Sequence, residues 1–110
     1  MKAALEIAFH NLQPSSSLEE DIRSRFEKLE RLYNRITTAR VAVEAPNRQH
    51  QSGNRFEVHI RMHVPGEELV VKREPAADAR IAVKEAFDLA ERRLLDYKKV
   101  AQGHVKHHVN

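Results

Sequence analysis

The chain contains no cysteine and no tryptophan, and it has only three glycines among its 110 residues. The absence of cysteine excludes disulfides, thiolate zinc sites and a cysteine nucleophile, and it suits a reducing cytoplasm. The sequence also lacks a glycine-rich phosphate loop. Aromatic residues make up only 5% of the chain, so valine, isoleucine, leucine and alanine must supply most of the core.

Long apolar runs are absent as well. No run approaches the roughly 20 residues that cross a bilayer, and the N-terminus is too short and too interrupted for a signal peptide. The content of 41% hydrophobic and 32% charged residues is typical of a globular protein, and 110 residues fit a single core. We therefore expect a cytoplasmic protein with one domain over residues 1–103 and a basic, histidine-rich tail over residues 104–110.

The charge is unevenly distributed. The formal net charge is +3, and the last twenty residues carry five Lys or Arg against two Asp or Glu. The other ninety residues carry fourteen of each sign, so the whole excess lies at the C-terminal end. Such clustering favours an anionic partner, although a solvated basic end that complements a helix dipole has the same composition.

Apolar and polar residues alternate in four segments, as half-buried strands require. The predicted strands cover residues 4–12, 36–45, 55–64 and 69–74. The third is the clearest, because its odd-numbered positions are all polar. They are Arg55, Glu57, His59, Arg61 and His63.

Helical periodicity appears twice. In residues 13–34, apolar side chains recur at helical spacing from Leu18 to Tyr33, and Ser17 with Glu20 fits a capping box. Asn34 is a candidate left-handed residue after this helix. A second helix of about 22 residues, or roughly 33 Å, starts after an N-cap at Asp78 and stops near Gly103. Its C-terminal turns should extend beyond the sheet.

The element order predicts an α+β fold, a two-layer β-α-β-β-β-α sandwich. The last three strands form an antiparallel meander, and both helices bury their apolar stripes on one face of the four-stranded sheet. The polar side chains of the third strand then lie on the open face.

No catalytic constellation is visible, so we do not expect an enzyme, a cofactor or a metal centre. His59 and His63 lie about 13 Å apart along one strand, which is too far for one metal ion. His104, His107 and His108 have closer spacing, but no carboxylate or thiolate completes a site there.

The closing helix carries the best candidate for binding. Its basic residues flank and oppose the apolar stripe, and with the tail they could follow a phosphate backbone by charge and shape. The candidates on this helix and the tail are Lys84, Arg92, Arg93, Lys98, Lys99 and Lys106.

The element order and two motifs resemble the bacterial family of ribosome hibernation-promoting factors and ribosome-associated translation inhibitors. The first motif is residues 26–30, FEKLE, and the second is residues 89–94, LAERRL, in a helix that starts at Asp78. The resemblance covers nearly the whole chain. Lys28, Arg92 and Lys98 match positions that are usually basic in the family, whereas Lys84, Arg93 and Lys99 are added from charge alone.

The resemblance implies a double-stranded-RNA-binding-like fold that binds the rRNA of the small ribosomal subunit, in the channel for messenger and transfer RNA. It implies inhibition of translation by occupancy, in a short form without the extra C-terminal domain. This sequence departs from the family at Arg80, which replaces an aromatic residue, and at Leu89 and Asp96, which replace frequent lysines.

An alternative hypothesis is a protein-interaction module of unknown oligomeric state. In that case the open sheet face or an edge strand would pair with a partner or with a second copy of the chain, without ribosome binding.

Overall fold

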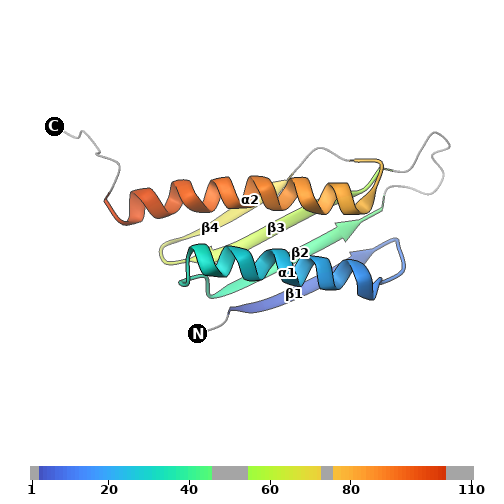
Figure 1. Ribbon diagram of the computed structural model, residues 1–110, viewed down its shortest axis with the longest axis horizontal. Coiled ribbons are helices and arrows are strands. Elements are labelled where there is room, and N and C mark those ends of the chain that lie inside the picture. The colour runs from blue at the N-terminus through green and yellow to red at the C-terminus, as the bar shows by residue number, and fades with distance from the viewer. Residues whose placement is uncertain (1–2, 46–54, 73–75, 104–110) are drawn as a thin grey trace.

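The computed structural model describes residues 3–45, 55–72 and 76–103, which contain four strands and two helices in the order β-α-β-β-β-α (Figure 1). The order and type of these elements agree with the sequence prediction, so the α+β class is confirmed. The strands and helices are β1 (Ala4–His10), α1 (Ser16–Leu32), β2 (Thr38–Glu44), β3 (Glu57–Val64), β4 (Glu67–Lys72) and α2 (Ala79–Ala101).

The strands form one mixed sheet in the order β1-β2-β3-β4. β1 pairs with β2 in parallel, and α1 connects the two strands. β2, β3 and β4 form the predicted antiparallel meander. The register places Val41 opposite both Ile7 and Ile60, so the apolar side chains of neighbouring strands lie on the same face.

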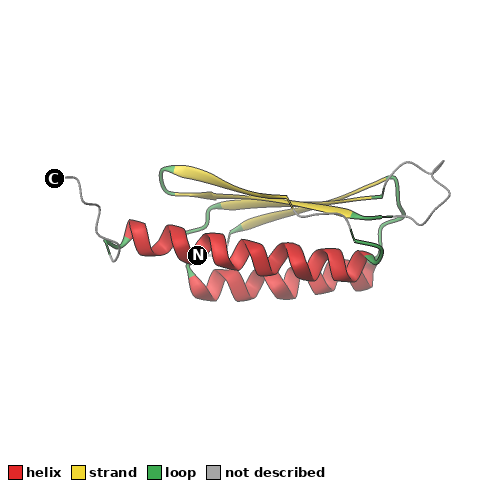
Figure 2. Ribbon diagram, turned by 90° about the horizontal axis from the view of Figure 1, so that it is seen from above, coloured by secondary structure: helices red, strands yellow, loops and turns green. Residues whose placement is uncertain are grey.

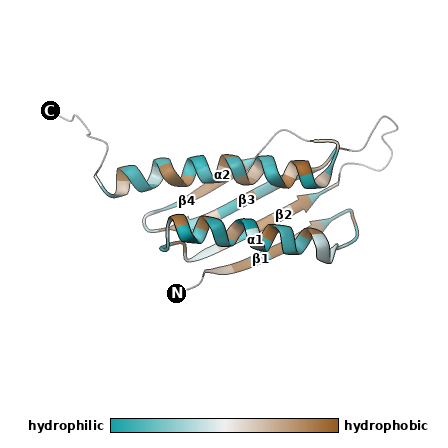
Figure 3. Ribbon diagram, in the orientation of Figure 1, coloured by the Kyte–Doolittle hydropathy of each residue, from teal (hydrophilic) through white to brown (hydrophobic). Residues whose placement is uncertain are grey.

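Both helices cover this apolar face, and the opposite face stays open (Figure 2). Ile22 of α1 and Leu94 of α2 are completely buried against the sheet, as are Val41 and Ile60. The buried side chains among the described residues are all apolar. Full burial of a large aliphatic side chain contributes about 1.5–3 kcal/mol to the stability of the fold. Hydrophobic and hydrophilic residues accordingly alternate along both helices (Figure 3).

The helices lie side by side and run in the same direction (Figure 1). At their N-terminal ends, the Arg80 guanidinium donates a hydrogen bond to the Ser17 hydroxyl. At their C-terminal ends, Lys98 Nζ donates to the carbonyl oxygen of Leu32 at 2.9 Å. The rings of Tyr33 and Tyr97 meet there edge to face, with centroids 5.6 Å apart. The negative ends of both helix dipoles therefore lie at the same end of the molecule.

The start of α1 differs from the prediction. Ser15, rather than Ser17, is the N-cap, and its Oγ accepts a hydrogen bond from the Leu18 amide at 3.1 Å. Each of three successive serines can cap a helix, and the earliest one allows two further residues to become helical. The prediction of a capping box formed by Ser17 and Glu20 is therefore wrong.

The end of α1 also differs. The predicted left-handed conformation of Asn34 is wrong, because Asn34 is not among the described residues with positive φ. The helix ends at Leu32, and its C-cap, Tyr33, has an extended conformation (φ −154°) that leads towards β2. The described non-glycine residue with positive φ is Asn11 (φ 63°), which follows β1 and turns the chain towards α1. Its side-chain amide donates to the Ala45 carbonyl at 3.5 Å.

The turn between β3 and β4 contains two residues, Pro65 and Gly66, so β4 starts at Glu67, earlier than predicted. Gly66 has φ 87°, a conformation that other residues adopt only with strain. Asp78 is the N-cap of α2 as predicted, with its carboxylate 2.7 Å from the Arg80 amide. Gly103 (φ 74°) follows the helix end.

The last turn of α2 extends past the sheet, as predicted (Figure 2). The Tyr97 hydroxyl donates to the Pro65 carbonyl, which places Tyr97 over the β3–β4 turn. Lys98 to Ala101 follow this contact. Neither helix among the described residues is long and apolar enough to cross a membrane.

Candidate nucleic-acid interface

A stripe of basic side chains follows the side of α2 that faces away from the sheet. Lys84, Arg92 and Lys99 are all exposed and recur at helical spacing. Arg92 lines two adjoining hollows, one shared with Lys84 and the other with Lys99. The structure therefore brings these three predicted residues together, and we call them the α2 basic stripe.

Acidic side chains interrupt the α2 basic stripe. Lys84 Nζ lies 3.0 Å from Asp88 Oδ2, but both side chains are about 60% exposed, so this pair contributes little to stability. Asp96 lines the same hollow as Arg92 and Lys99, and the half-buried Leu89 lines the one beside Lys84. Leu89 and Asp96, two of the three departures from the family pattern on this helix, thus lie next to the basic residues.

Two other predicted residues on α2 make hydrogen bonds to the backbone. Arg93 Nη1 donates to the Val70 carbonyl of the edge strand β4 at 3.0 Å. Lys98 donates to Leu32 at the end of α1. Each contact uses one donor, while a guanidinium offers five and an ammonium three, so both side chains keep donors for a ligand.

Lys28 is exposed on α1, and Lys106 lies outside the described residues together with the tail histidines. Sequence reasoning missed Arg31 and Arg35, which stand at the C-terminal end of α1. This end lies beside the C-terminal end of α2, because Lys98 reaches Leu32. The common direction of the helices therefore gathers basic groups from two distant segments, which no local motif signals.

Tyr97 lies at this same end. Burial, and then the hydrogen bond and charge of Tyr33, raise the pKa of the Tyr97 hydroxyl above its ordinary value of 10.0, while Arg35 acts in the opposite direction. The hydroxyl therefore remains a donor to Pro65 at neutral pH. This hydrogen bond links the C-terminal part of α2 to the turn between β3 and β4.

Residues 5–102 match the family described as Sigma 54 modulation protein / S30EA ribosomal protein. The chain belongs to this family. The match spans α1, all four strands and α2, and it confirms the resemblance to hibernation-promoting factors. Membership supports association with the ribosome and a role in regulating translation. The family is one of ribosome-associated factors and not a known class of enzyme.

Solved structures of other proteins share the fold of this family member. One is a ribosomal subunit interface protein from Coxiella burnetii, with a TM-score of 0.73 and 15% identity, covering 86% of this chain and 97% of that one. Another is the N-terminal domain of Protein Y from Thermus thermophilus, with a TM-score of 0.70 and 20% identity, covering 88% of this chain and 99% of that one. None of the curated proteins matches the sequence.

Proposed function

We propose that the protein binds the rRNA of the small ribosomal subunit in the channel for messenger and transfer RNA, and that it inhibits translation by occupying this channel. Family membership supports the ribosome as partner. One of the structurally similar proteins is named a ribosomal subunit interface protein. This function places the protein in the cytoplasm and requires no chemical step.

The observation that carries the proposal is the α2 basic stripe. Within the described part of the chain, the side chains of Arg92 and Lys99 make no hydrogen bond or ion pair. Exposed cations that follow one side of a helix can contact successive phosphates without reading bases. Lys28, Arg93, Lys98 and Lys106 would extend the same surface. The aromatic residues in the described part of the chain are all buried or half-buried, so we expect recognition by shape and charge rather than by base stacking.

The test is cosedimentation with purified small subunits at several salt concentrations. The triple variant Lys84→Gln, Arg92→Gln and Lys99→Gln should bind roughly tenfold more weakly or worse. The slope of log affinity against log salt should also fall by about one unit for each phosphate that the variant no longer neutralises.

A matched control removes the same charge from the other side of the molecule. Arg40, Arg61 and Lys72 are exposed on the open face of the sheet, and their replacement by glutamine should leave binding nearly unchanged. Weaker binding by this control, with normal binding by the stripe variant, would move the interface to the sheet. Binding by both variants at the affinity of the parent would contradict a cationic interface. It would favour the protein-interaction alternative if light scattering also showed a dimer.

A further inference from the structure

The open face of the sheet carries charged side chains in rows across the strands. One row contains Glu6, Arg40 and Arg61, which stand in register on β1, β2 and β3. Arg40 lies 4.0 Å from Glu6, and Arg61 lies 3.9 Å from Glu68 on β4. His63 Nε2 is 3.0 Å from the same Glu68 carboxylate. Arg40 and Arg61 thus stand directly opposite each other, but each of these like charges has a carboxylate nearby.

The other half of the face contains a pair of like charges. Glu44 on β2 stands directly opposite Glu57 on β3, and both side chains point to the open face. Two carboxylates in this position repel each other and destabilise a sheet. His59, two residues after Glu57, lies on the same face, with Nε2 3.2 Å from Glu57 Oε1.

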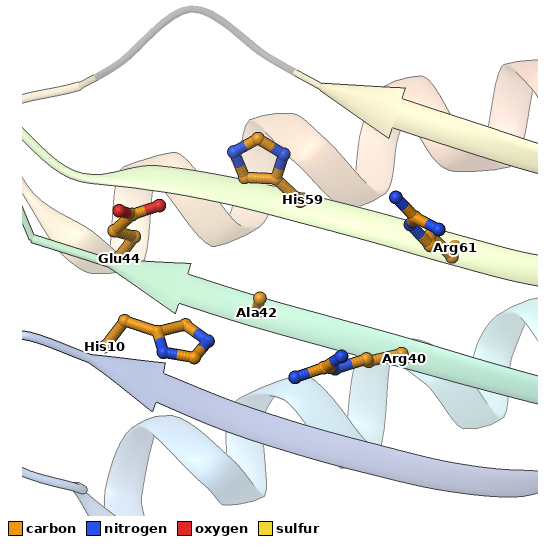
Figure 4. A pocket seen from close by; sticks show the side chains of 6 residues that line it. All are labelled: His10, Arg40, Ala42, Glu44, His59 and Arg61. Carbon is orange, nitrogen blue, oxygen red and sulfur yellow. The ribbon is translucent and has the colours of Figure 1, made fainter.

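These three side chains form a compact set of donors. One ligand atom from each of Glu44, Glu57 and His59 lies within 4.8 Å of the other two. Glu44 and His59 also line an open hollow of about 330 Å³. The rest of its lining is His10, Ala42 and the two arginines Arg40 and Arg61, which lie near the carboxylates of Glu6 and Glu68. Figure 4 shows the His59 ring and the Glu44 carboxylate on the open side of β3 and β2, near the strand ends.

We propose that Glu44, Glu57 and His59 form a binding site for a divalent transition metal, with zinc as the expected ion. Zinc takes carboxylate oxygen and imidazole nitrogen at about 2.0–2.2 Å, so its ligand atoms stand about 3.3 Å apart. The His59–Glu57 distance already has this value, and rotation of the Glu44 side chain can bring its carboxylate closer.

The mixed donor set favours zinc over the alkaline-earth ions. Imidazole suits zinc and its neighbours in the first transition row, whereas calcium and magnesium take oxygen ligands. A bound dication would also remove the repulsion between Glu44 and Glu57. Lys72, in register with His59 on β4, is exposed and flexible enough to keep its ammonium in solvent, away from the ion.

The site was not foreseen from the sequence, because its ligands come from two strands. Spacing along β3 relates His59 to His63, which instead bonds to Glu68. The β2–β3 register brings Glu44 to the site from thirteen positions before Glu57.

The experiment is a zinc titration of the full chain by calorimetry, in a background where His104, His107 and His108 are replaced by glutamine. We expect one zinc ion per chain. His59→Gln and Glu57→Gln should each weaken the affinity at least about tenfold, since even the loss of an outer-shell partner has an effect of this size. Zinc should also shift the imidazole nitrogen resonances of His59 in NMR spectra.

Matched controls lie on the same face. His63→Gln and Glu6→Gln remove an imidazole and a carboxylate that belong to other pairs, and both should bind zinc like the parent. Glu44→Gln removes the like charge, so without zinc it should melt at the same temperature as the parent or higher. The proposal is overturned if the parent binds no zinc, or if His59→Gln and Glu57→Gln bind it unchanged.

Discussion

At the scale of single residues, the basic side chains of α2 divide into two groups. Arg92 and Lys99 point into solvent, and their position relative to the apolar stripe could be predicted from helical spacing alone. The contact between Lys98 and Leu32 could not, because the two residues are 66 positions apart and meet only when both helices are packed. Charge and periodicity thus identify a candidate for binding, whereas its structural role depends on a distant backbone carbonyl.

Tyr97 provides a test at this scale. Its raised pKa means that the fold favours the protonated hydroxyl, so its stabilising effect is present below pH 10.0 and is lost as the pH rises through the folded-state pKa. Tyr97→Phe should lower the unfolding free energy by about 0.5–1 kcal/mol at pH 7. Denaturant titrations between pH 7 and 11 should show the difference between the two proteins shrinking above pH 10. A difference that stays constant over this range would contradict the assignment.

At the scale of elements, the sequence predicts the strands and helices well and their ends less well. Alternation identified every strand, because each has one face on the core and one in solvent. The start of α1 was ambiguous, since Ser15, Ser16 and Ser17 can all cap a helix. The turn at Pro65 and Gly66 was also tighter than the run PGEE indicated, because pairing with β3 extends β4 to Glu67.

The serine at the start of α1 can be tested directly. Ser15→Ala removes the acceptor for the Leu18 amide and should lower the unfolding free energy by about 1 kcal/mol, as measured by urea denaturation. Ser17→Ala is the comparison. Ser17 lies inside the helix, where alanine has the higher helix propensity, and the hydrogen bond that its hydroxyl accepts from Arg80 is exposed, so this change should alter the unfolding free energy by less than about 0.5 kcal/mol. The reverse order of stabilities would restore Ser17 as the cap.

At the scale of the whole molecule, the sequence predicts two layers, since both helices have one apolar stripe and the strands have one apolar face. It does not reveal that Arg31 and Arg35 join Lys98 and Lys99 at one end, because this follows from the common direction of α1 and α2. The sequence also does not reveal the proposed metal site on the open face, because the pairing register of β2 and β3, and not spacing along the chain, brings its residues together.

Lys98 and Lys99 are adjacent in the chain and allow stability and binding to be separated. Lys98→Ala removes the hydrogen bond to the end of α1 and should lower the unfolding free energy by about 1 kcal/mol. Lys99→Ala should change stability by less than about 0.5 kcal/mol, because its side chain is exposed. Both should weaken cosedimentation with small subunits. Equal stabilities of the two variants would show that the Lys98 contact does not hold the helices together.

The strand order has a consequence for how the chain folds. Because β1, β2, β3 and β4 lie in the sheet in the order in which they occur in the sequence, no strand has to be inserted between two others that have already paired. Each pairing closes a loop between consecutive strands, and the entropy of loop closure rises only slowly with loop length. Topologies built from contacts between sequence neighbours reach the native state quickly. We therefore expect the sheet to assemble strand by strand, with the antiparallel meander forming faster than the parallel pair of β1 and β2, whose partners lie far apart in the sequence.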